Sequence, residues 1–499
     1  MRQTCLFDIP SVADKWQVQS FSADNFGQQA ARVSLEKKLI NITIVSSDIN
    51  RQSVSYQLSK NDCLHRWLKY KEGFSADLVK RLLKEFDIQK DDTVLDPFVG
   101  SGTTALVCKM QGINSIGLDI LPMSKIAIEA KKAVFDYDLS EIKRVITDIE
   151  NLEISENYVQ RTNYITITDG AYPEATENEI EFFTHWNEDS NYSKMAKNLV
   201  TLCILNSLEK ISYTAKDGQF LRWDYRSKKM LESAENRKQN GKTPLVIRLD
   251  KGSLPSLKQT LSEELNSVYH DISTIQRNSN PTVSKLQFVE GSALYELPKL
   301  DDNILNGVIT SPPYCNRYDY TRTYALELAY LGVTDEKIKR LRQDLLSCTV
   351  ENKSKIDQIK ENYAALGKEA DFERITKIIE NNQTLNEINN SLTERSKNGD
   401  INNKGVLRMI DGYFTELTFI YAELFRLCKT GAKVAFVNDN VRYGGEVISV
   451  DFLSTELAEQ IGFKPIKIYS LKQQKGNSSQ QMAKFGRVPL RKSITVWEK

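Results

Sequence analysis

The chain has 499 residues, of which 40% are hydrophobic and 27% are charged, and its formal net charge is +1. A chain of this size and composition buries one large core and one or two smaller ones, which excludes a disordered protein. Its seven cysteines include no C-x-x-C pair and its three histidines lie far apart, so we expect neither a metal site nor a disulfide framework.

The N-terminus lacks the pattern of a signal peptide, and no apolar run reaches about 18 residues, so we expect a cytoplasmic protein without membrane spans. Residues 1–60 carry no motif. The first strong element is an amphipathic helix over 76–86, which follows the segment Lys71-Glu-Gly-Phe-Ser75. Ser75 stands at the N-cap position, so an ordinary capped helix is one interpretation of this segment.

A glycine-rich turn follows the next strand. The apolar run 93–98 contains Asp96 near its end, and Gly100-Ser-Gly102 then leads into a helix. Glycines let a backbone come close to a ligand, and open α/β sheets bind small molecules at the carboxyl ends of their strands. A carboxylate at Asp96 suits the charged amino group of an amino-acid-like cofactor. No Lys follows the glycines, which excludes a P-loop.

The next predicted strand covers 115–119 and ends at Asp119. This is the position expected for a carboxylate that holds ribose hydroxyls. A glycine-rich turn followed by an acid occurs in many α/β proteins, so these features alone leave the ligand open.

A second motif, Ser311-Pro-Pro-Tyr314, follows the apolar strand 304–311. Two prolines cannot continue a strand ladder, and one interpretation is that they only end the strand. The turn also exposes carbonyls and a hydroxyl. The exocyclic amine of a base is a poor nucleophile because its lone pair is delocalised into the ring. Acceptors at Ser311 and the Pro312 carbonyl suit its two N–H groups, and the Tyr314 ring suits stacking on the base.

With both motifs present, the chain resembles the DNA amino-methyltransferases, the S-adenosylmethionine enzymes of restriction-modification systems. The resemblance implies S-adenosylmethionine as cofactor and double-stranded DNA as partner, and it leaves open a cognate restriction endonuclease and the oligomeric state. It implies a catalytic turn of Ser311, Pro312, Pro313 and Tyr314. It also implies cofactor contacts at Phe74, Ser75, Asp96, Pro97, Phe98, Gly100, Ser101, Gly102, Thr103, Asp119 and Ser292, the last of which stands where the family more often has Asp.

In that family, Ser before Pro-Pro is more typical of cytosine N4 than of adenine N6 methylation. We therefore expect a site-specific methyltransferase that modifies N4 of a flipped cytosine. Adenine N6 methylation, methylation of an RNA amino group and a non-catalytic DNA-binding subunit remain as alternatives. The chain has no Pro-Cys pair, which argues against methylation of a cytosine ring carbon.

The core segments alternate between strand and helix, which predicts a mostly parallel sheet with helices on both faces. After 286–291 and 304–311 the series continues as helix 406–428, strand 432–438, helix 451–461 and the closing strands 463–471 and 493–497. The closing pair matches the antiparallel edge hairpin of Rossmann-like class I methyltransferases. We expect an N-terminal extension (1–60), core segments (61–135, 286–332 and 405–499), a large inserted domain (136–285) and a helical insert (333–404).

Basic and aromatic residues gather in three places that suit DNA phosphates and an extruded base. The first insert is expected to recognise the target, with scaffolding or dimerisation as the alternative, and the helical insert to form a hairpin or coiled coil that clamps DNA or binds a partner. The expected DNA contacts are Arg317, Tyr318 and Tyr320 after the catalytic turn, Arg222 and Trp223 in the first insert, and Lys475 and Arg487 in the basic C-terminal loop.

Overall fold

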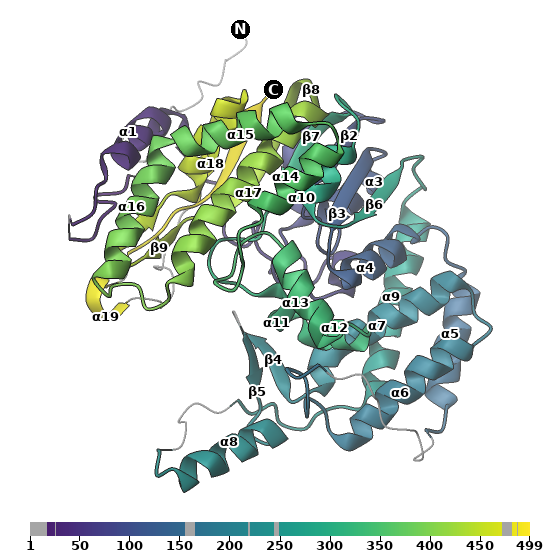
Figure 1. Cartoon of the computed structure of the whole chain (residues 1–499). Coiled ribbons are helices and arrows are strands. Elements are labelled where there is room, and N and C mark those ends of the chain that lie inside the picture. The colour runs from purple at the N-terminus through teal and green to yellow at the C-terminus, as the bar shows by residue number, and fades with distance from the viewer. Residues whose placement is uncertain are drawn as a thin grey trace.

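The computed structural model describes residues 17–24, 26–154, 165–217, 220–243, 249–471, 482–486 and 488–499 (Figure 1). Lys475 and Arg487, two expected DNA contacts, lie outside the described residues. Among the helices that the structure describes, none is both long and apolar enough to cross a membrane.

An eight-stranded sheet forms the centre of the molecule, in the order β1-β11-β12-β8-β7-β2-β3-β6. Neighbouring strands run parallel except β12, which is antiparallel to both β11 and β8. The predicted mostly parallel methyltransferase sheet is therefore confirmed. Its strands are β1 (Thr43–Val45), β2 (Thr93–Asp96), β3 (Asn114–Asp119), β6 (Leu286–Glu290), β7 (Leu305–Thr310), β8 (Cys428–Asp439), β11 (Lys464–Ser470) and β12 (Lys492–Glu498).

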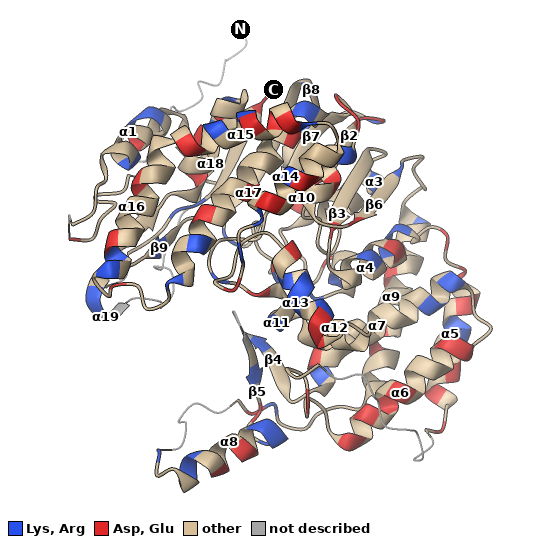
Figure 2. Ribbon diagram, viewed as in Figure 1, with Lys and Arg blue, Asp and Glu red and all other residues tan. Residues whose placement is uncertain are grey.

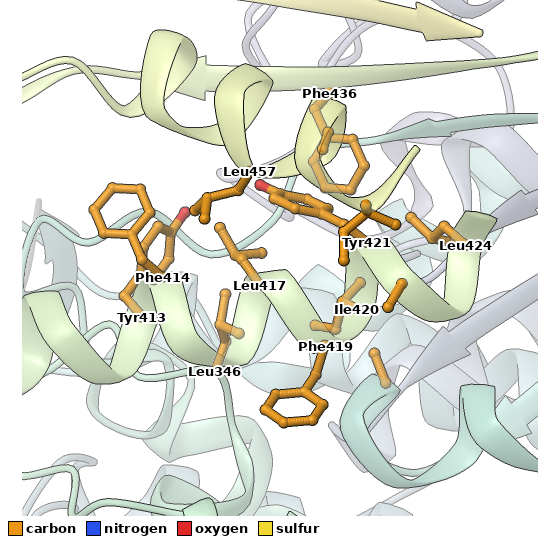
Figure 3. Packing of buried hydrophobic residues seen from close by; sticks show 14 of the residues in the cluster. Leu346, Tyr413, Phe414, Leu417, Phe419, Ile420, Tyr421, Leu424, Phe436 and Leu457 are labelled. Carbon is orange, nitrogen blue, oxygen red and sulfur yellow. The ribbon is translucent and has the colours of Figure 1, made fainter. Parts of the chain in front are cut away.

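Helices cover both faces of the sheet because successive strand side chains point to opposite sides. Val94 and Ile309 are buried in the cluster that holds α2 and α3, whereas Leu95 and Val308 are buried in the cluster that holds α17 and α18. Figure 3 shows part of the second cluster, with Tyr421 of α17 beside Phe436 of β8. The core helices are α2 (Ala76–Glu85), α3 (Thr103–Met110), α4 (Pro122–Lys132), α10 (Ala293–Glu296), α17 (Gly405–Leu427) and α18 (Val450–Ile461).

The chain leaves β2 toward β3 and β6 on one side and leaves β7 toward β8 on the other. The strand order therefore reverses between β2 and β7. In open α/β sheets such a reversal opens a crevice at the carboxyl ends of the two strands, where ligands bind.

The N-terminal extension contributes to this sheet, which the sequence did not indicate. Its helix α1 (Ala30–Leu39) leads through the short turn η2 (Ile40–Ile42) into β1, which pairs with β11 in parallel. The β11–β12 hairpin was expected to form the edge of the sheet. Instead, β1 covers β11 and forms that edge itself.

The first insert forms a helical body on the side of α4. Leu121, Met123 and Ala127 at α4 share one buried apolar cluster with the helices of the insert. A two-stranded hairpin and a helix project from this body (Figure 1). The elements are α5 (Leu139–Asn151), α6 (Glu174–Asp189), α7 (Lys194–Ile211), β4 (Thr214–Asp217), β5 (Phe220–Trp223), α8 (Lys228–Gln239) and α9 (Leu257–Asn278).

The second insert consists of four helices, three of which pack on α17, and not of the single helical hairpin or coiled coil that was expected. These are α13 (Asp335–Asp344), α14 (Ile356–Ala365), α15 (Glu369–Asn381) and α16 (Gln383–Lys397). The apolar faces of the last three pack on α17 in one cluster. The remaining elements are η3 (His65–Trp67), η4 (Leu297–Lys299), α11 (Tyr320–Thr323), α12 (Ala325–Tyr330), β9 (Val441–Tyr443), β10 (Glu446–Ile448) and α19 (Met482–Phe485).

A buried ion pair fixes the start of β12. The Arg491 guanidinium donates to both carboxylate oxygens of Asp451 on α18, at 2.5 and 2.9 Å, and both side chains are fully buried. Ser493 donates to the same carboxylate. Arg491 belongs to the basic C-terminal stretch that the sequence associated with DNA, but its burial and this pair give it a structural role.

We predict that Arg491→Met lowers the free energy of unfolding by about 3–5 kcal/mol, because it leaves the buried Asp451 carboxylate without its partner. The double variant Arg491→Met/Asp451→Asn should recover part of this loss, since it removes the isolated charge as well. Urea unfolding of the two variants and the wild type measures the difference. Equal stability of Arg491→Met and wild type would contradict this role.

Candidate active site

The site begins where β2 and β7 end side by side. Asp96 is the last residue of β2, and Thr310 is the last residue of β7. The Thr310 hydroxyl donates to the Asp96 carboxylate at 2.6 Å, and the backbone N–H of Phe98 donates to the same oxygen at 3.1 Å. This contact holds the glycine loop next to the turn that begins at Ser311.

The glycine loop needs its glycines. Gly100 and Gly102 have φ angles of +52° and +95°, a region that L side chains rarely adopt. A Cβ atom at Gly100 would lie 2.7 Å from the Tyr70 ring, and one at Gly102 would lie 2.8 Å from Ile128. Gly100 therefore lets the loop lie directly against the Tyr70 ring.

Two further groups hold the loop in place. The N–H of Gly100 donates to one carboxylate oxygen of Asp119, and the N–H of Leu121 donates to the other, each at 2.8 Å. The buried ammonium of Lys131 on α4 donates to the Ser101 carbonyl at 2.9 Å. Burial lowers the pKa of Lys131 to about 7. Neither Lys131 nor Tyr70 was indicated by a sequence motif.

A cavity lies over these strand ends and encloses about 720 Å³ of space, part of it open to solvent. Its wall combines the glycine loop, the end of β3, the start of α10 and the turn that begins at Ser311. Of the residues expected at the cofactor or in catalysis, those that line it are Phe74, Asp96, Pro97, Phe98, Gly100, Ser101, Thr103, Asp119, Ser292, Ser311 and Pro313. Residues more than two hundred positions apart in the chain, such as Asp96 and Ser311, thus meet in one cavity.

Two expected cofactor residues have other contacts. The Ser75 hydroxyl accepts the N–H of Leu78 and caps α2, and the side chain is buried. Gly102 packs against Ile128. The contact of Ser75 matches its interpretation as an ordinary helix cap.

The second insert contributes to the cavity wall, which no sequence signal indicated. Asp344, the last residue of α13, and the next two residues, Leu345 and Leu346, line the cavity. The Ser292 hydroxyl donates to the Asp344 carbonyl at 2.9 Å. Leu346 also lies in the buried cluster around α17 (Figure 3), so this wall is anchored to the core.

Burial raises the pKa of Asp96 and of Asp119 to about 6, although hydrogen bonds to both carboxylates favour their ionised forms. A carboxyl group with such a pKa gains the most from a nearby cation, because the cation restores its ionised form. The cavity therefore suits a ligand with a positively charged group and hydroxyls.

The turn Ser311-Pro-Pro-Tyr314 makes contacts of its own. The Ser311 and Tyr314 hydroxyls lie 2.9 Å apart in a hydrogen bond. The Lys492 ammonium lies over the Tyr314 ring, 5.2 Å from its centre. The Tyr443 hydroxyl donates to the Cys315 carbonyl at 2.8 Å, which ties the turn to β9.

The expected DNA contacts separate into two groups. Tyr320 is buried in the cavity wall, and Tyr318 packs against it edge to face, with ring centres 5.1 Å apart. Arg317, half-buried, has a φ angle of +68°. In the first insert, Arg222 is exposed on β5 beside Trp223, and the Lys229 ammonium lies 4.7 Å from the centre of the Trp223 ring.

Comparisons with known proteins agree with this geometry. Residues 13–129 match the sequence model of a family described as DNA methylase, and residues 76–252 match that of the D12 class N6 adenine-specific DNA methyltransferases. The chain is 56% identical to the Type II methyltransferase M.BsoBI of Geobacillus stearothermophilus over 99% of this chain and 96% of that protein. It is 38% identical to the Type II methyltransferase M.AvaI of Nostoc sp. over 96% of this chain and 95% of that protein.

The chain belongs to the Type II DNA methyltransferases. The expected resemblance to DNA amino-methyltransferases of restriction-modification type is thereby confirmed. Type II methyltransferases use S-adenosylmethionine as methyl donor, and the residues of the cavity fit it. The buried Asp96 and the half-buried Asp119 are carboxylates that suit its ammonium and ribose hydroxyls, and Phe98 and Leu121 offer apolar surface.

We predict that cofactor affinity falls as the pH drops through about 6. Asp96 and Asp119 have raised pKa values of about 6 in the free protein; below this pH they are neutral and no longer attract the cationic cofactor. Calorimetric titration with S-adenosylmethionine between about pH 5 and pH 8 measures the effect. Asp96→Asn should bind weakly throughout, whereas Glu290→Gln, an exposed carboxylate paired with Lys125, should keep the wild-type profile. A flat wild-type profile would contradict the assignment.

Proposed function

We propose that the enzyme methylates the N4 amino group of cytosine at a specific sequence in duplex DNA. The observation that carries the proposal is the turn Ser311-Pro-Pro-Tyr314, whose Ser311 and Pro313 line the same cavity as Asp96. The Thr310 hydroxyl bound to Asp96 keeps this turn within reach of a cofactor held by the glycine loop. Ser before Pro-Pro is the feature that favours cytosine.

Each part of the turn has a role in the proposed reaction. S-adenosylmethionine, when bound, supplies a methyl group activated by its sulfonium. The target base is flipped out of the duplex, since its amino group is not accessible in the stack. Ser311 and the Pro312 carbonyl accept the two N–H groups of the amine and localise its lone pair. Tyr314 stacks on the base, a contact worth about 1–3 kcal/mol.

For the base to enter, the turn must give up two contacts that it makes in the free protein. The Ser311 hydroxyl is bonded to the Tyr314 hydroxyl, and the Lys492 ammonium lies over the Tyr314 ring. A base stacked on that face of the ring displaces Lys492, whose ammonium then suits the phosphate of the flipped nucleotide. The turn is therefore proposed to change its partners when the base enters.

The surface around the opening supports a duplex as the substrate. Figure 2 shows Lys and Arg on β5, at the start of α8, on α13 and at α19. Helix α8 has no buried residue and carries Lys228, Lys229, Arg237 and Lys238 against Glu232 and Glu235. We propose that the β4–β5 hairpin and α8 contact DNA and that the segment 136–285 selects the target. A cognate restriction endonuclease is the proposed partner in the cell.

Adenine N6 is the second candidate, because residues 76–252 match the D12 class N6 adenine-specific family. The proposed chemistry is the same for both bases. Genomic DNA from a methylation-deficient host that expresses the protein separates them by single-molecule sequencing. We expect one motif with N4-methylcytosine. Methylated adenine in one motif would keep the mechanism and overturn the base, and no mark on DNA would contradict the proposal.

Replacement of Ser311 should affect turnover more than cofactor binding. In Ser311→Ala the turn loses an acceptor for the amine, while Asp96 and Asp119 are untouched, so we expect turnover to fall about 10²- to 10³-fold with cofactor affinity near wild type. Single-turnover assays with labelled cofactor and calorimetry measure the two quantities. Ser292→Ala, on the opposite wall, is the matched control and should lower cofactor affinity first. Equal loss of both quantities in Ser311→Ala would indicate misfolding instead.

A further inference from the structure

A buried aromatic and ionic network runs from the β4–β5 hairpin to the cofactor cavity. Tyr324, between α11 and α12, is its centre and is fully buried. The network joins the β4–β5 hairpin of the first insert to the cavity wall beside the glycine loop. None of its contacts is required by the chemistry proposed above.

On the cavity side, Tyr324 stacks on Tyr70 with ring centres 5.1 Å apart and ring planes within 9°. Tyr70 lies against Gly100, where a Cβ atom would come within 2.7 Å of its ring. The Tyr324 hydroxyl donates to the carboxylate of Glu72 and accepts the N–H of Lys71 at 3.1 Å. Both Tyr70 and Glu72 line the cavity.

On the hairpin side, the ammonium of Lys216 on β4 lies over the Tyr324 ring. It is 4.5 Å from the centre of the Tyr324 ring and forms a buried ion pair with Glu327 of α12. The Lys216 carbonyl accepts the ammonium of Lys71, and its N–H donates to Glu209 at 2.9 Å. Lys216 is thus held by four partners and has little freedom to move alone.

The hairpin also packs against α12, the helix that follows Tyr324. Leu221 of β5 is buried with Ala325 and Leu328 of α12, so a shift of the hairpin moves the helix that follows Tyr324. Separating the buried Lys216–Glu327 ion pair is costly, because each charge would then lie in the interior without a partner or water. We therefore expect hairpin, Tyr324 and cavity wall to move together and not independently.

Glu72 connects the network to the ligand site, because it lines the cavity and accepts the Tyr324 hydroxyl. Burial raises its pKa, while the hydrogen bonds from Tyr318 and Tyr324 favour the ionised form. A carboxylate in the wall of a cavity that binds a cation gains from keeping its negative charge. Whatever holds the Tyr324 hydroxyl on Glu72 therefore strengthens cofactor binding.

We propose that Tyr324 is a positioning residue through which DNA bound at the β4–β5 hairpin raises the affinity of the cavity for the cofactor. The inference rests on the proposed contact between the hairpin and DNA. By linkage, the cofactor raises the affinity for DNA by the same factor. The enzyme would then hold its methyl donor most tightly when DNA is present.

The test is calorimetry of the full-length protein with S-adenosylhomocysteine, with and without sheared genomic DNA from a methylation-deficient host. This probe has no methyl group to transfer, so the result is independent of which base is methylated. For the wild type we expect DNA to tighten the binding by about fivefold or more, the lower end of typical coupling between sites. In Tyr324→Phe, which keeps the ring and loses the hydroxyl, the factor should fall to near one, while the DNA affinity of the cofactor-free protein stays unchanged.

Tyr330→Phe is the matched control. Tyr330 is the last residue of α12, and its hydroxyl contacts Thr184, which is not part of the network. It should keep the wild-type coupling. Glu327→Gln, which weakens the ion pair with Lys216, is a second variant that should lower the coupling should Tyr324→Phe fail to fold. Absence of coupling in the wild type, full coupling in the folded network variants, or equal loss in Tyr330→Phe would overturn the proposal.

Discussion

The hydrogen bond from Thr310 to Asp96 joins the two strand ends on which the site depends. Asp96 ends β2 and opens the glycine loop, while Thr310 ends β7 and is followed directly by Ser311. More than two hundred residues separate the two in the chain, yet the reversal of strand order makes their strands neighbours. A loop suited to a cationic cofactor and a turn suited to a base amine are thereby held in one cavity, which is the arrangement that direct methyl transfer requires.

The inserts add to this core in different ways. The first builds a helical body on α4 and carries the β4–β5 hairpin and helix α8, on which Lys and Arg residues lie (Figure 2). The second packs on α17 and sends Asp344 to Leu346 into the cavity wall beside Ser292. Part of the cavity wall therefore comes from the second insert and not from the core segments. The buried ionisable groups Asp96 and Lys131 and the half-buried Asp119 lie around this cavity and favour a charged ligand there.

The core strands and the cavity were predictable because local chemistry specifies them. Apolar runs that end in an acid, glycines before a helix and two prolines after a strand gave the positions of β2, β3 and β7 and the residues at their ends. The rest depends on contacts distant in sequence. A three-residue strand such as β1 has no pattern of its own and exists because β11 offers an edge. Tyr70 and Asp344 join the cavity only through packing, and Arg491, one of several basic residues in sequence, is distinguished by its burial against Asp451.

The central claim is that cofactor and target base meet between the ends of β2 and β7. A crystal structure with S-adenosylhomocysteine and duplex DNA that carries the target motif in unmethylated form tests it most directly. We expect the amino group of the ligand within hydrogen-bonding distance of Asp96, its ribose at Asp119, and a flipped base with its amine at Ser311 and the Pro312 carbonyl. A base that remains stacked in the duplex, or a cofactor bound away from the glycine loop, would contradict the account.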